Sequence, residues 1–137
     1  MNIRFKRPDP KHAVSIVDAA IRDMKFTLTL PVTPASGSTI IRNIYDCFRM
    51  LGESILVGEG KIVKGHEPHI KAFLSFPGVS TSRPPQLIEN LRNLRNNISY
   101  YGYQPQPIEV EEAIRFAQAC FTPYAQAIRK QVDQRKI

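Results

Sequence analysis

The sequence predicts an all-α fold, an up-and-down four-helix bundle with one additional short helix. Four segments of the 137-residue chain carry apolar residues at steps of three and four, which is the spacing of one face of an amphipathic helix. No stretch alternates apolar and polar residues convincingly, as a half-buried strand would. Segments rich in proline and glycine separate the four patterns, so each helix should end before the next one begins.

The four expected helices are defined by their apolar faces. In chain order, these faces consist of Val14, Val17, Ile21, Met24 and Leu28; of Ile41, Ile44, Phe48, Leu51 and Ile55; of Leu87, Leu91, Leu94, Ile98 and Tyr101; and of Val110, Ile114, Ala117, Phe121, Tyr124 and Ile128. Pro123 lies inside the last pattern and predicts a kink there, because a proline in a helix interior removes a hydrogen bond and crowds the preceding turn.

Turn-forming residues predict where the helices begin and end. Residues 31–38 separate the first two helices, and Ser38 or Thr39 is expected to cap the second. The additional short helix is expected over residues 68–76, because proline suits a first turn. Gly102 is expected to end the third long helix in a left-handed conformation, which glycine adopts without steric cost.

Length and composition indicate one globular domain. Residues 1–9 are expected to form a basic N-terminal tail with Arg4, Lys6 and Arg7, and residues 10–137 to form a single helical domain. No apolar run approaches the roughly 18 residues that span a bilayer, and no secretory signal is recognisable, so a cytoplasmic location is expected. The formal net charge of +7 favours a polyanionic partner such as RNA.

The remaining motifs predict no metal site and no hydrolytic constellation. His66 and His69 are three residues apart and enclose Pro68, whereas two histidines that hold zinc on a helix lie four apart. His66 is therefore interpreted as a cap or loop contact of the short helix. Cys47 and Cys120 fall within helical patterns and are expected to be buried, reduced thiols.

The most informative stretch is residues 91–102, which combines a helical apolar face with arginines, amides and an aromatic pair. Arg92, Arg95 and Asn96 are expected on a polar flank beside that face. The guanidinium of Arg95 has a fixed fork of donors suited to phosphate, and Asn96 can orient it by hydrogen bonding. Alternatively, Arg95 and Asn96 only fasten the following loop to the first helix or to a partner subunit.

Residues 95–102, Arg-Asn-Asn-Ile-Ser-Tyr-Tyr-Gly, resemble the signature of the HEPN domain (higher eukaryotes and prokaryotes nucleotide-binding). In that family, an arginine near the end of the third long helix is usually followed by a polar residue and then by a histidine. The similarity extends to residues 44–60 and to Gly65-His66-Glu67, and it covers most of residues 10–132. It implies a small helical homodimer in which arginine and histidine from two subunits meet in a cleft and cleave RNA without a metal.

The chain departs from this signature, because Tyr100 or Tyr101 stands where the family has its histidine. Histidine accepts a proton near neutral pH, whereas tyrosine, with an ordinary pKa of about 10, is a poor acceptor there. We therefore expect a dimeric HEPN-like domain, weak or inactive as a nuclease, that binds nucleotide or RNA phosphate through Arg92, Arg95 and Asn96. The resemblance also implies a protein partner such as a nucleotidyltransferase, as in two-component toxin–antitoxin systems.

Two alternatives stay open at this stage. The first is an active metal-independent endoribonuclease, whose candidate catalytic residues are Arg95, Asn96, Tyr100 and Tyr101. The second is a structural helical scaffold in which Arg95 only packs the bundle. None of these hypotheses involves a metal or a cofactor.

Overall fold

The computed structural model describes residues 3–134 and is predominantly helical, which confirms the all-α prediction. In chain order its elements are β1 (Ile3–Phe5), α1 (Pro10–Thr27), α2 (Gly37–Gly58), β2 (Lys61–Val63), α3 (His66–Leu74), the 3-10 helix η1 (Pro85–Leu87), α4 (Ile88–Tyr101) and α5 (Pro107–Gln134). The last three residues of the expected domain, 135–137, lie outside the described residues. Within residues 3–134, no helix is long and apolar enough to cross a membrane.

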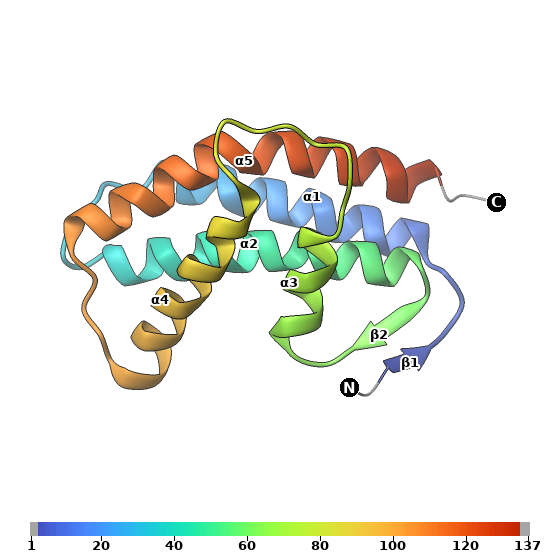
Figure 1. The fold of residues 1–137 in the computed structure, drawn as a ribbon, viewed down its shortest axis with the longest axis horizontal. Helices are drawn as coiled ribbons and strands as arrows, with labels where there is room; N and C mark the ends of the chain where they lie inside the picture. The colour runs from blue at the N-terminus through green and yellow to red at the C-terminus, as the bar shows by residue number, and fades with distance from the viewer. Residues whose placement is uncertain (1–2, 135–137) are drawn as a thin grey trace.

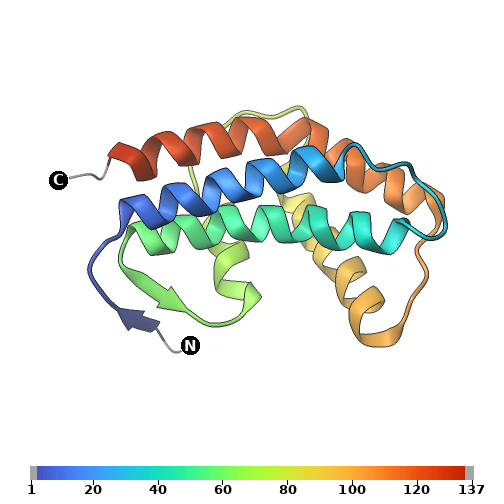
Figure 2. The ribbon, with the colours of Figure 1, turned by 180° about the vertical axis from the view of Figure 1, so that it is seen from behind.

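Three long helices, α1, α2 and α5, lie side by side and contact one another (Figures 1 and 2). The two shorter helices, α3 and α4, contact α2, and α4 is steeply inclined to the three long helices (Figure 1). The C-terminal end of α4 therefore projects away from them. The up-and-down four-helix bundle is not confirmed, because α4 does not run alongside the other three.

The core is centred on Phe48 of α2. Its ring contacts Phe73 of α3 and the rings of Phe116 and Phe121 of α5, with centroid distances of 5.4, 4.9 and 5.4 Å. Phe73 in turn contacts Tyr124 at 4.7 Å. Aromatic pairs at these separations add to the free energy gained by burying their area. The cluster therefore joins α3 and α5 to one α2 side chain.

The expected apolar faces of α2 and α5 are buried except for Ile55 and Ile114, which are partly buried at the edge of the core. The faces of α1 and α4 need correction. The buried face of α1 is displaced and consists of Ala13, Val17, Ala20, Met24 and Thr27. Of the residues expected there, Val14, Ile21 and Leu28 are only partly buried at its edge. Tyr101 is 82% exposed and not on the buried face, because the end of α4 projects beyond α2 (Figure 1). Cys47 and Cys120 are buried free thiols, as expected.

The helix ends agree with the sequence at Gly102 and differ at α2. Gly102 adopts φ 67° and ends α4, as predicted. The prediction of a cap at Ser38 or Thr39 is wrong, because α2 begins at Gly37 and Ser36 occupies the capping position. The Ser36 hydroxyl does not cap the helix, since it donates to the carbonyl of Pro31 at 2.6 Å.

Two further boundaries differ from those expected. The short helix α3 begins at His66, two residues earlier than the sequence indicated. The last helix, α5, runs continuously through Pro123, and the kink expected at that residue stays a prediction.

A two-stranded antiparallel sheet joins the start of the chain to the segment after α2. Ile3 pairs with Val63 and Phe5 with Lys61. Beyond the strand, the amide of Lys6 donates to the carbonyl of Gly60 at 2.8 Å. The expected basic tail of residues 1–9 therefore contains a strand, which was missed because three residues are too few to establish an alternating pattern.

Candidate functional site

The last turns of α4 bring Arg95, Asn96 and Tyr100 together. Nη1 of Arg95 donates to Oδ1 of Asn96 at 3.2 Å and to Oη of Tyr100 at 3.3 Å. Tyr100 follows Arg95 by five positions, and α4 stays helical through Tyr101. Long helical side chains lean toward the N-terminus, so Tyr100 reaches back along α4 to meet the guanidinium.

Tyr45 of α2 is a member of this site that the sequence did not reveal. Cζ of Arg95 lies 5.6 Å from the centroid of the Tyr45 ring and 5.6 Å from that of Tyr100, which are cation–π distances. Tyr45 is only 1% exposed, and its hydroxyl has no hydrogen-bond partner among residues 3–134. Burial raises the pKa of Tyr45, although Arg92, Arg95 and Arg49 act in the opposite direction.

The charge of Arg95 is not neutralised by a carboxylate in the described part of the chain. By contrast, Arg49, Arg83, Arg115 and Arg129 each form an ion pair of 2.8 or 2.9 Å. Arg95 is held by an amide oxygen, a phenol and two aromatic rings, none of which is a carboxylate. The guanidinium is thus oriented without being compensated.

Of the two other predicted site residues, Arg92 lies close to this arrangement and Tyr101 does not contact Arg95. Arg92 lies one helical turn before Arg95, and its only carboxylate partner within residues 3–134, Glu89, is 4.0 Å away. Its field acts on the Tyr45 hydroxyl together with that of Arg95. Tyr101 has no contact with Arg95 among the interactions of the described residues, so Tyr100 is the tyrosine that joins the arginine.

His66, the first residue of α3, was interpreted from the sequence as a cap or loop contact, but it reaches the same tyrosine. Its ring centroid lies 5.7 Å from that of Tyr45, and the side chain is half-buried. The pKa of His66 is lowered, first by burial and then by the charges of Arg95 and Arg49. No spacing in the sequence links residues 45, 66 and 95, because the packing of α3 and α4 on α2 creates this proximity.

His69, three positions after His66 in α3, has a structural role. It is buried, its Nδ1 accepts from Nη1 of Arg49 at 2.9 Å, and its Nε2 donates to the carbonyl of Val63 at 3.1 Å. These partners define the neutral tautomer, in agreement with a pKa lowered mainly by burial. Across residues 3–134, no group of three or more histidine, cysteine or acidic side chains could hold a metal ion.

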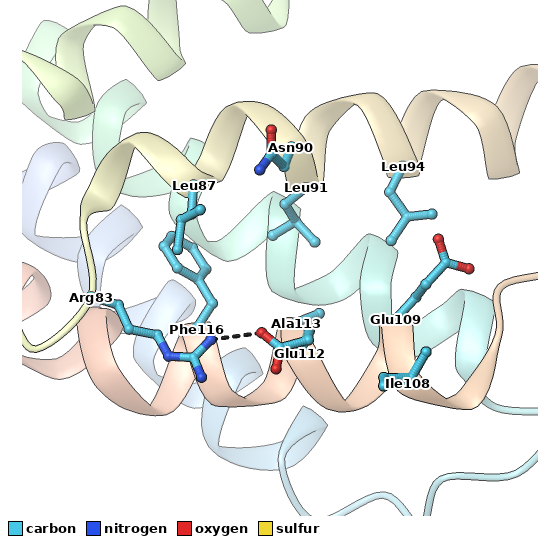
Figure 3. Close-up of a pocket in the computed structure, with 10 residues that line it drawn as sticks. All are labelled: Arg83, Leu87, Asn90, Leu91, Leu94, Ile108, Glu109, Glu112, Ala113 and Phe116. Carbon is cyan, nitrogen blue, oxygen red and sulfur yellow. Dashed lines mark hydrogen bonds and ion pairs between the residues drawn. The ribbon is translucent and has the colours of Figure 1, made fainter.

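An apolar pocket of about 360 Å³ lies on another side of α4, between this helix and α5 (Figure 3). Leu87, Leu91 and Leu94 line it from one side and Phe116 and Ile108 from the other. An ion pair of 2.8 Å between Arg83 and Glu112 lies at one end (Figure 3). Helix α4 therefore borders two surfaces, one cationic and one apolar.

Comparison of the chain with known protein families, with characterised proteins and with solved structures finds no match. The functional argument therefore depends on the geometry of Arg95, Asn96, Tyr100, Tyr45 and Arg92, which we call the Arg95 site.

Proposed function

We propose that the protein is a dimeric HEPN-like domain that binds the phosphate groups of a nucleotide or of RNA at the Arg95 site. The observation that carries the proposal is the state of the Arg95 guanidinium, which neutral groups hold in place and no carboxylate within residues 3–134 compensates. A fixed guanidinium fork matches the geometry of phosphate oxygens. An incoming phosphate would gain the full interaction, since it displaces no bound acid.

The surroundings of Arg95 suit a nucleic acid. Arg92 adds a second, weakly paired cation one helical turn away. Tyr100 and Tyr101 expose 68% and 82% of their surface, and exposed aromatic rings stack with unpaired bases. The net charge of +7 would raise the local concentration of a polyanion around the chain. The proposal includes a cytoplasmic location, which the two unpaired, buried cysteines support.

The dimer is part of the proposal. Tyr101 and Ile108 are large exposed residues near the junction of α4 and α5, and Ile108 also lines the apolar pocket. The family resemblance implies that a second copy packs against this end of α4 so that two Arg95 side chains come near one cleft, where a shared phosphate would relieve their repulsion. A nucleotidyltransferase-type protein is the alternative occupant that the family resemblance implies.

Binding of a fluorescently labelled single-stranded RNA tests the proposed function. Arg95→Ala should weaken binding by about tenfold or more, because hydrogen bonds to charged groups contribute about 1.5–3 kcal/mol. Arg129→Ala is the matched control, since it removes the same charge from the distal part of α5, where Arg129 pairs with Asp18. If Arg95→Ala lowers the melting temperature but leaves RNA binding unchanged, Arg95 has only the structural role of the scaffold hypothesis.

The second candidate is an active metal-independent endoribonuclease that uses Arg95 with tyrosine in place of histidine. The contact of 3.3 Å between the Tyr100 hydroxyl and Nη1 of Arg95 favours it, because this hydroxyl would lie beside a bound phosphate. RNA cleavage in the presence of EDTA, abolished by Arg95→Ala, would support this activity. If the RNA stays intact at high protein concentration, the endoribonuclease hypothesis is wrong and only the binding function remains.

A further inference from the structure

Two side chains from different helices meet at the Tyr45 ring. The Arg95 guanidinium comes from α4 and the His66 imidazole from α3, at 5.6 and 5.7 Å from the ring centroid. The charge of Arg95 influences the imidazole more strongly than that of Arg49, which also faces it. The packing of α3 and α4 on α2 therefore brings the His66 imidazole and the Arg95 guanidinium to the same ring.

The imidazole of His66 is available for such a ligand. Within residues 3–134, its ring nitrogens have no hydrogen-bond partner, whereas both ring nitrogens of His69 are bonded. His66 opens α3, and Gly65 before it provides no side chain to cap the helix. A Cβ added at Gly65 would meet nothing within 4 Å, so there is open space beside this end of the helix. The uncapped amides and the positive end of the dipole add to the attraction for an anion.

We infer that His66 is a second phosphate ligand of the Arg95 site, so that one phosphate group is held between the α4 guanidinium and the α3 imidazole. This inference rests on the proposed function and specifies how the phosphate is held. It assigns a ligand role to a residue that lies outside the arginine motif and reaches the site only through tertiary packing.

The arrangement links phosphate binding to proton uptake. In the free protein, burial and the fields of Arg95 and Arg49 lower the pKa of His66, while Asp46 acts in the opposite direction and His69 in the same one. A phosphate between Arg95 and His66 would offset the guanidinium charge and favour the imidazolium, which raises this pKa. Between the free and bound pKa values, the complex therefore binds more protons than its components. The affinity for phosphate should rise as the pH falls from the bound to the free pKa of His66, and it should become constant below the free pKa.

Isothermal titration calorimetry with an oligouridylate that lacks terminal phosphates tests the inference. Neither its diesters nor its bases titrate between about pH 5 and 8, so protons taken up must come to the protein. In buffers of different ionisation enthalpy near neutral pH, the wild-type protein should take up a measurable fraction of one proton per bound site. Its Kd should fall by up to about tenfold toward acidic pH, which corresponds to one unit of pKa rise.

His66→Gln should abolish this uptake and the pH dependence while the protein still binds RNA. His12→Gln is the matched control, since it makes the same change at an exposed position on the first turn of α1. Circular dichroism establishes that both variants are folded. Wild-type binding without proton uptake, or uptake that persists in His66→Gln, would overturn the inference and leave phosphate binding at Arg95 intact. If Arg95→Ala bound RNA as tightly as the wild type, the proposed function itself would be wrong.

Discussion

Gly52 of α2 packs directly against the backbone of His69 in α3. A Cβ built at Gly52 would overlap the carbonyl oxygen and carbon of His69. This close approach places α3 on α2, and α3 carries both the structural His69 and the proposed ligand His66. The position of His66 relative to Tyr45 thus depends on a residue that has no side chain.

Gly52→Ala should therefore separate α3 from α2. Because the new methyl would meet backbone atoms, which cannot rotate away, we expect a loss of at least about 1–3 kcal/mol in the free energy of unfolding. Gly37→Ala is the matched control on the same helix. Its Cβ would meet only side-chain atoms, Val110 Cγ2 at 3.1 Å and Pro105 Cγ at 3.6 Å. Urea denaturation that gave equal losses for the two variants would contradict this account of the α2–α3 contact.

Gly102→Ala should destabilise the end of α4 through the backbone alone. Gly102 has φ 67°, and no atom lies within 4 Å of a Cβ placed there. Replacing glycine in the left-handed region costs roughly 1 kcal/mol, and asparagine tolerates this region better than alanine does. We expect thermal denaturation to rank the wild type first, Gly102→Asn second and Gly102→Ala last. Identical melting temperatures for the two variants would argue against a conformational origin.

The sequence predicted the parts of the site that lie close together along the chain. Arg95, Asn96 and Tyr100 belong to one helix, and Gly102 marks its end by its backbone preference. Tyr45 was not predicted, because it lies on another helix and its burial depends on tertiary packing. His66 was recognised as part of a helix start, but its distance from Arg95 depends on how closely α3 approaches α2.

The fold shows the same division between local and tertiary information. Helical periodicity identified α1, α2, α4 and α5, because each pattern spans several turns. It placed Tyr101 in the core, since periodicity cannot show that α4 crosses α2 and projects beyond it. The predicted apolar face of α1 was wrong because Ala13 and Ala20 are buried there. These small residues are easily overlooked beside the larger Val14 and Ile21, which are only partly buried.

The proposed dimer predicts a specific effect of Ile108→Glu. Ile108 is 65% exposed and lines the apolar pocket between α4 and α5. A buried, unpaired carboxylate in the interface would be costly, so the variant should be monomeric by light scattering at micromolar concentration while its melting temperature is retained. Phe26→Ser is the control, because Phe26 of α1 is 64% exposed and does not line this pocket. A monomeric wild-type protein would contradict the shared cleft.

The two histidines of α3 predict that the free energy of unfolding falls in mild acid. The pKa values of His66 and His69 are lowered in the folded protein, in both cases mainly by burial. Below the unfolded-state value of about 6.5, the unfolded chain therefore binds more protons than the native state. The free energy of unfolding should be highest above that pH and decline as the pH falls toward the folded-state pKa values.

The carboxylate of Glu112 does not obscure this effect. Arg83 and Arg115 lower the pKa of Glu112 from an ordinary value of 4.5. Its contribution to the free energy of unfolding is therefore lost only below that pH. Urea denaturation between about pH 5 and 7.5 isolates the histidines. His69→Gln should be less stable than the wild type at neutral pH, because the contacts with Arg49 and Val63 are weakened, but its stability should vary less with pH. A wild-type protein whose stability stayed level or increased on acidification over this interval would show that neither histidine is held neutral by its surroundings.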